Sequence, residues 1–116
     1  MAAGDVVITR DFVIPLGPGG GRPRVVMGTV TLDGGNPTPI ELGGMLSSID
    51  GAVVSIEGAG APGADPTAVS SLINGTSVDV YAWKPTTGGA AGNPDLIAST
   101  NNARLVSFIA IGPDKK

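Results

Sequence analysis

The sequence of 116 residues contains no cysteine and no histidine. Without cysteine there is no disulfide framework and no thiolate metal ligand, and a reducing compartment is allowed. Without histidine the chain lacks the most common general base, zinc ligand and pH-sensitive group of proteins. A nucleophilic hydroxyl would need a lysine as its base, and Lys84 stands at a strand end, where a surface lysine is the better interpretation. We therefore expect a protein that is not an enzyme and has no catalytic residue, cofactor or metal site.

Aromatic and charged residues are also scarce. The chain has one Trp, one Tyr and two Phe, and its seven basic and ten acidic residues give a net charge of −3 with no run of either sign. Nucleic-acid binding needs a basic patch and stacking aromatics, so we expect no nucleic-acid partner. No apolar run is long enough to span a bilayer, and residues 1–5 lack the features of a signal peptide. These observations predict a protein made in the cytoplasm without a membrane partner.

Glycine and proline are abundant, at 19 and 10 residues, while 41% of the chain is hydrophobic. This combination is typical of short strands joined by turns. We expect a single all-β domain over residues 1–116, an antiparallel β-sandwich or barrel of seven or eight strands, with a jelly roll among the alternatives. An N-terminal arm (1–5) and a solvated C-terminal tail (113–116) would flank it. The expected strands are 6–14, 24–32, 52–57, the two strands of a hairpin over 70–85, 96–98 and 104–112, and the long Gly/Pro loops are 15–23, 58–66 and 85–95.

Other segments carry turn signals rather than chemistry. The glycine run in 15–23 lacks the second half of a phosphate-binding loop, and Asp33 with its glycines lacks the further oxygen ligands of a calcium loop. Residues 42–49 have apolar side chains at helical spacing, which suggests one helical turn there. In the first strand Val6, Ile8, Phe12 and Ile14 share one parity, so they are expected on one face.

The clearest local signal is a β-hairpin over residues 70–85. Asn74-Gly75 is the preferred pair for a two-residue turn, because both residues tolerate a positive φ. Beyond the turn, Val78, Val80 and Ala82 alternate with Asp79, Tyr81 and Trp83. The strand therefore presents a small apolar face and a second face that carries two aromatics.

Four residues are candidates for an interaction surface: Tyr81, Trp83, Val106 and Phe108. Tyr81 and Trp83 share a strand face, which favours an interface anchor or a half-buried sheet face, with a carbohydrate-stacking pair as the alternative. In the last strand Val106 and Phe108 lie on one parity, and the other parity is apolar as well. Such a strand is either central in a sheet or meets another subunit with its outer face.

Four segments resemble the small virion proteins of tailed bacteriophages. They are residues 3–10 (AGDVVITR), 30–38 (VTLDGGNPT), 78–85 (VDVYAWKP) and 106–112 (VSFIAIG). The resemblance implies a structural role, that of a head decoration or cement protein. Such a protein would sit on the capsid surface of the virion as a β-rich homotrimer and hold neighbouring capsomers of the major capsid protein together. A tail or baseplate module is the alternative within the virion, and a small carbohydrate-binding β-sandwich is the alternative from another class.

Overall fold

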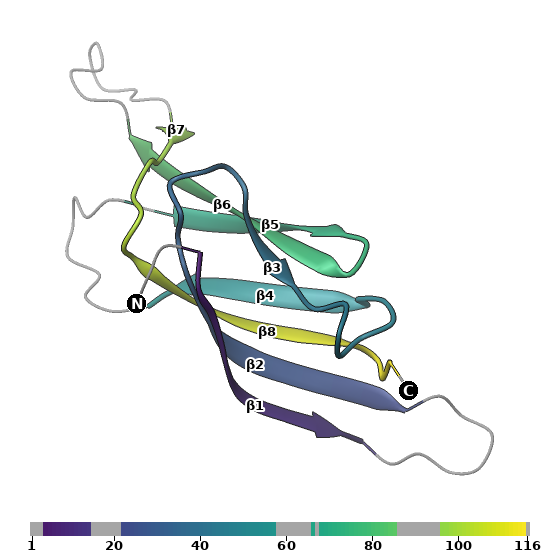
Figure 1. Ribbon diagram of the computed structural model, residues 1–116. Helices are drawn as coiled ribbons and strands as arrows, with labels where there is room; N and C mark the ends of the chain where they lie inside the picture. Colours follow the sequence, from purple (N-terminus) through teal and green to yellow (C-terminus); the bar gives the residue numbers. More distant parts are fainter. Residues whose placement is uncertain (1–3, 15–21, 58–65, 67, 86–95, 116) are drawn as a thin grey trace.

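The computed structural model describes residues 4–14, 22–57, 66, 68–85 and 96–115, which form eight strands and no helix (Figure 1). Two antiparallel sheets make a β-sandwich, so the predicted all-β sandwich is confirmed. Within these residues no helix could cross a membrane. The strands are β1 (Val6–Val13), β2 (Pro23–Thr31), β3 (Thr38–Glu41), β4 (Gly51–Ile56), β5 (Ala68–Asn74), β6 (Ser77–Pro85), β7 (Leu96–Ala98) and β8 (Leu105–Pro113).

The first sheet, called sheet A, has the strand order β1-β2-β8-β4. The second, sheet B, has the order β3-β6-β5, and β7 pairs with the end of β6 on the side opposite β5. The chain crosses between the sheets after β2, β3, β4 and β7 (Figure 1). The last strand therefore lies between two strands from the first half of the chain, which ties both halves into one body.

The core lies between the inner faces of the two sheets. Its members alternate along each strand, as the period of two requires. Small and branched side chains dominate, and Phe108 is the largest fully buried residue. The segment between β3 and β4 adds Leu42, Leu46 and Ile49 to this core. The other buried apolar residues are Val26, Val30, Leu32, Ile40, Val78, Val80, Ala82, Val106 and Ala110.

A β-bulge divides β1. Ile8 pairs with Gly28 but Arg10 pairs with Met27, so Thr9 is an extra residue and the register shifts there. Side chains beyond the bulge swap faces, because one added residue moves each of them to the opposite side. The prediction that Phe12 lies on the face of Val6 and Ile8 is therefore wrong. Phe12 pairs with Val25 on the outer face and is 49% exposed.

The hairpin is present with its turn one residue further along. Asn74 pairs with Ser77, so the two loop residues are Gly75 and Thr76 rather than Asn74 and Gly75. Gly75 has a φ of +64°, the left-handed conformation that glycine adopts without a steric penalty. The expected alternation of β6 is confirmed, because Val78, Val80 and Ala82 are all buried.

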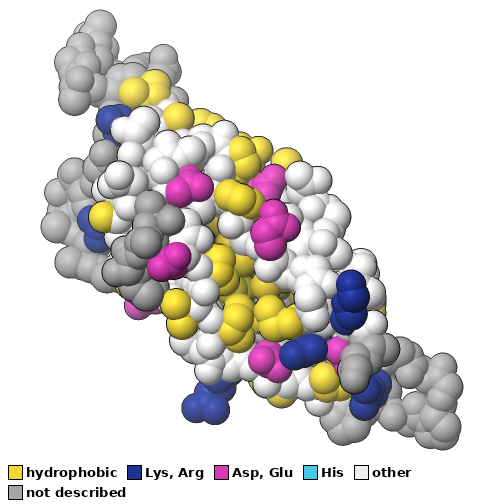
Figure 2. Space-filling view, viewed as in Figure 1, with side chains coloured by type: hydrophobic (Ala, Val, Ile, Leu, Met, Phe, Trp, Pro, Cys, Tyr) yellow, Lys and Arg dark blue, Asp and Glu magenta, His cyan; other side chains and the backbone are white. Residues whose placement is uncertain are grey.

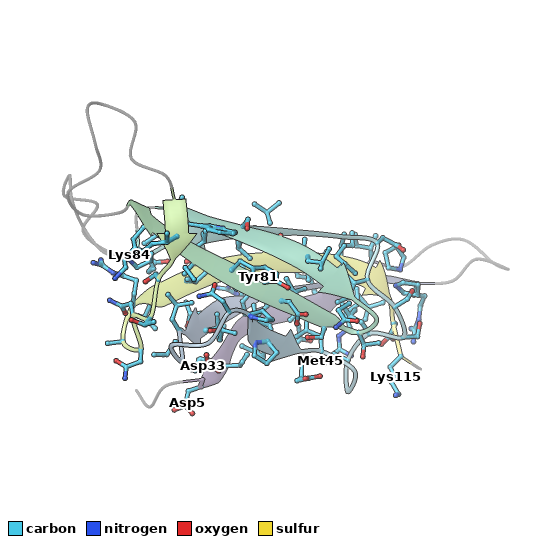
Figure 3. The ribbon with its side chains drawn as sticks, turned by 90° about the horizontal axis from the view of Figure 1, so that it is seen from above. Asp5, Asp33, Met45, Tyr81, Lys84 and Lys115 are labelled. Atoms are coloured by element: carbon cyan, nitrogen blue, oxygen red, sulfur yellow. The ribbon has the colours of Figure 1, made fainter. Side chains whose placement is uncertain are left out.

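The chain ends are part of the fold as far as they are described. The Gly4 amide donates to the Thr31 carbonyl at 2.8 Å, and the Thr31 amide donates to the Asp5 carbonyl at 2.9 Å. At the other end Asp114 is buried, and the Lys115 amide donates to the Met45 carbonyl at 3.0 Å. Figure 3 shows Met45 and Lys115 at the same end of the sandwich. The expectation of a solvated tail is therefore wrong for Pro113, which ends β8, and for Asp114, whereas the side chain of Lys115 is exposed as expected.

The segment between β3 and β4 contains the expected turn. The amides of Met45 and Leu46 both donate to the carbonyl of Leu42, at 3.0 and 2.9 Å, which closes a single helical turn. Most of the three predicted Gly/Pro loops, at 15–21, 58–65 with 67, and 86–95, lies outside the described residues.

Gly28 is required where β1 crosses close to β2. A Cβ atom at this position would collide with the carbonyl oxygen of Val7. We expect Gly28→Ala to lower the free energy of unfolding by roughly 1–3 kcal/mol, because the backbone of an overpacked site has to shift. Gly44→Ala is the matched control, since nothing lies within 4 Å of its Cβ position. Urea unfolding of both variants checks this, and equal midpoints would contradict it.

Candidate interaction surface

The outer face of sheet A carries an apolar patch. It consists of Phe12, Val25, Met27, Val53, Ile109 and Ile111, and these residues come from all four strands of the sheet. Val53 is 66% exposed and Ile109 is 47% exposed, whereas Val25 and Met27 are half-buried. We call this set the sheet A patch.

The strand register arranges the sheet A patch in two neighbouring rows. One row runs Phe12, Val25, Ile111, Gly51, and the other runs Arg10, Met27, Ile109, Val53. The following row contains Val7, Thr29, Ser107 and Ser55, so the surface becomes polar there. Arg10 is the one charged residue in the two apolar rows. The patch is therefore bounded and almost free of charge.

The size of the sheet A patch is comparable with that of the largest apolar patch on a typical monomer. Its six side chains together expose on the order of 400 Å², a value within the range of the largest patch on a typical monomer, where such patches are often functional. On the face seen in Figure 2, by contrast, acidic and basic side chains are interspersed with hydrophobic ones. The outer face of sheet A is thus the strongest candidate for a contact with another protein.

Two of the predicted interface residues are in the core. Val106 is fully buried and Phe108 is 2% exposed, because they pair with Val30 and Gly28 on the inner face of sheet A. The assignment of these two residues to an interface is therefore corrected. The alternation along β8 puts Ile109 and Ile111 on the outer face instead. A strand that is apolar on both faces was expected either to be central in a sheet or to meet another subunit. Strand β8 is central in sheet A, and its outer face is exposed and available to a partner.

The other two predicted residues, Tyr81 and Trp83, lie on the outer face of sheet B. Both are half-buried, and Figure 3 shows Tyr81 along β6. The indole Nε1 of Trp83 donates to Ser70 Oγ at 3.0 Å. Further along this face, Asp79 is buried and accepts hydrogen bonds from Ser77 Oγ at 3.1 Å and Asn74 Nδ2 at 3.3 Å. This face combines hydrogen-bonded polar groups with one exposed apolar side chain, Leu72 (56% exposed), beside Asp79, and it belongs to a different sheet from the patch.

A charged cluster closes one end of the sandwich. Arg24 Nη2 lies 2.9 Å from Asp11 Oδ1, and Arg24 Nη1 lies 3.2 Å from Asp114 Oδ1. Arg22 makes a longer contact with Asp114, at 3.4 Å. The hydrogen bond with Asp11 is the main reason that the pKa of Arg24 is raised above its ordinary value, and Asp114 adds to it. Each carboxylate is paired with an arginine, so the cluster ties β1, β2 and the C-terminal segment together.

The Asp33 turn also has a structural role. Its carboxylate Oδ1 accepts hydrogen bonds from Thr38 Oγ1 and the Gly35 amide, both at 2.8 Å. The Asn36 side chain then links two segments, because its Nδ2 donates to the Ser99 carbonyl and its Oδ1 accepts from the Ala82 amide, both at 2.8 Å. Among the described residues no group of three or more acidic side chains could hold a metal ion. Turn formation therefore accounts for these residues.

The sequence missed Phe12 and Val53 as surface candidates. Val53 lies on the polar-facing parity of its strand beside Ser55, and this parity was a usable signal. Phe12 was hidden by the bulge, since a two-residue period counted through Thr9 assigns it to the core face. The residues of β1 alone do not indicate that a bulge will add one residue opposite β2.

The comparisons with known proteins found no match: no family model matches the chain, and neither a curated protein nor a solved structure matches it. The two outer faces of the sandwich and the four short segments are therefore the features of this chain that bear on its function.

The charged cluster predicts a difference between its two arginines. Arg24→Met leaves Asp114, whose side chain is 4% exposed, without its closer partner, so we expect a loss of about 2–4 kcal/mol in the free energy of unfolding. Arg22→Met removes a side chain that is 54% exposed and should cost about 1 kcal/mol or less. Chemical unfolding of the two variants measures both values. Equal losses would show that Asp114 does not depend on Arg24.

Proposed function

We propose that this chain is a structural protein of a bacteriophage virion, a head decoration protein that binds the outer surface of the major capsid protein lattice as a homotrimer. In this role it stabilises contacts between neighbouring capsomers. The observation that carries the proposal is the sheet A patch, a bounded apolar face built by all four strands of sheet A. The resemblance of four segments to small virion proteins supplies the biological setting.

The architecture suits a protein that acts through contact. The strands are paired across both sheets, and polar side chains that satisfy one another hold the two ends of the sandwich: Arg24 with Asp11 and Asp114 at one end, and Asn36 with Ser99 at the other. A rigid body of this kind loses little conformational entropy when it binds. Each contact with a capsid can be weak, because many copies on one shell act together through multivalency.

The two outer faces differ in a way that fits an assembly protein. The sheet A patch offers apolar side chains with a single charge, whereas sheet B offers a hydrogen-bonded face with Tyr81 and Trp83 half-buried. Apolar area with few charges is typical of the buried centre of a protein interface. A polar face with aromatic residues suits an outward position or the rim of a contact. This division supports a particle component that assembles with other copies through one face and keeps the other face in solvent.

The copy number in purified particles tests the proposal. If the chain decorates the head, mass spectrometry of virions from the source lysate should give a ratio to the major capsid protein near one to one, as expected when trimers occupy every local three-fold position. A handful of copies per particle would favour the tail or baseplate alternative. Absence of the chain from purified particles would overturn the proposal.

The carbohydrate-binding alternative rests on Tyr81 and Trp83, which share the outer face of sheet B. Trp83 is the only tryptophan, so its fluorescence reports directly on this face. If the chain binds no sugar, the emission spectrum of Trp83 should stay unchanged across a panel of bacterial polysaccharides. A saturable quench or blue shift, lost in Tyr81→Ala, would favour this alternative, because a stacked sugar removes water from the indole.

A further inference from the structure

We infer that the sheet A patch packs against the same patch of a second copy of this chain, with Phe12 of one copy seated over Gly51 of the other. This inference deepens the self-association that is part of the proposed function, because it names the face through which identical chains meet, and it can be tested on the purified chain without a capsid. The inference follows from the sizes of the side chains in the two apolar rows and from the position of Arg10, the one charged residue in them.

The first row is asymmetric in shape. Phe12, the largest side chain of the patch, stands on the edge strand β1, while Gly51, which has no side chain, stands on the opposite edge strand β4. The row runs from one to the other through Val25 and Ile111. Around the Cβ position of Gly51 the nearest atom is Ile111 Cγ2, at 4.0 Å, so the space above this residue is open. One end of the row is a projection and the other end is a gap.

A symmetry axis parallel to the strands brings these two ends together. Such an axis carries the β1 edge of one copy to the β4 edge of its neighbour at the same level along the strands. A two-fold axis of this kind also sets Val25 over Ile111 and Met27 over Ile109 in both directions. A three-fold axis parallel to the strands keeps the contact between the β1 and β4 edges. The projection and the gap therefore complement each other in a closed assembly of identical chains.

The charges agree with this register. The second row places Arg10 at the β1 edge and Val53 at the β4 edge, so Arg10 faces Val53 of the neighbour and not a second Arg10. The aliphatic part of an arginine can cover an apolar side chain while the guanidinium reaches water. Val53, 66% exposed in the single chain, would thereby be covered. Like charges do not meet in the contact.

The area is close to what a stable contact between identical chains needs. A standard interface buries about 800 Å² on each partner, and in homodimers about 65% of that is apolar, which amounts to roughly 500 Å². The sheet A patch, on the order of 400 Å², supplies most of this apolar centre. A partner of another kind would have to bring an apolar face of matching size. A second copy brings one that also has the gap for Phe12.

The experiment places a side chain in the open space above Gly51. In a single chain Gly51→Leu is accommodated, because no positive φ and no close atom opposes it, but in the assembly the leucine occupies the place of Phe12. If the patch associated only because it is apolar, an added leucine would strengthen association. We expect the reverse, a weakening of about tenfold or more in the dissociation constant. Gly44→Leu, at an exposed turn with no atom within 4 Å of its Cβ position, is the matched control and should leave association unchanged.

Removing the projection completes the test. Phe12→Ala should also weaken association by about tenfold or more, since aromatic anchors dominate interface energetics. The double variant Phe12→Ala with Gly51→Leu should recover part of the loss, because the leucine then sits over the alanine; this non-additivity identifies two residues in contact. Sedimentation equilibrium over a concentration series measures each dissociation constant, and urea unfolding checks that every variant folds.

The outcomes test the self-association and the proposed function separately. A wild-type chain that stays monomeric at its highest soluble concentration overturns the inference, as does Gly51→Leu behaving like Gly44→Leu. Two single variants that weaken association without recovery in the double variant would show that Phe12 does not meet Gly51. Self-association with no chain in purified virions would overturn the proposed function and leave this inference standing. A chain that is present in virions but stays monomeric in solution would overturn this inference and leave the proposed binding to the capsid standing.

Discussion

Strand β8 imposes the constraint on which the rest of the structure depends. It is hydrogen-bonded along both edges, to β2 and β4, and it is apolar on both faces. Only one face can enter the core of a two-layer sandwich. Val106, Phe108 and Ala110 take the core side, where full burial of a side chain as large as Phe108 contributes about 2–3 kcal/mol. Ile109 and Ile111 are consequently left on the outside, where they form the middle of the apolar patch.

The two ends of the sandwich show how polar residues are used when they carry no chemistry. At one end Arg24 joins Asp11 and Asp114, and at the other the amide of Asn36 joins the Ala82 and Ser99 backbones. Most polar atoms of these groups have a partner, which offsets the cost of burial, and Arg24 Nε is a buried atom without one. The polar side chains that would suggest a site in the sequence are thus occupied in holding loops to sheets. The interaction surface consists instead of apolar residues, which carry no functional motif in the sequence.

All strands except β3 (Thr38–Glu41) could be predicted, because their signals are local. Alternation in β6, the Asn-Gly pair near the hairpin turn and the Gly/Pro segments between strands each act within a few residues. The errors occurred where distant segments set the outcome. The bulge at Thr9 depends on how β1 pairs with β2 at Gly28, and the C-terminal segment is held by Arg22 and Arg24, far earlier in the chain. The turn at Gly75 is a local exception, because it differs from the prediction by one residue within the hairpin itself.

By itself, the sequence determined an all-β chain with strands of known position, and it determined that β8 is apolar on two sides, because both follow from a period of two in neighbouring residues. Only the tertiary structure decided which side of β8 is buried, since that depends on the position of sheet B. It also decided that Phe12 faces outward, since one extra residue in β1 reverses every side chain after it. The sheet A patch exists because these two decisions place Phe12, Ile109 and Ile111 on the same face.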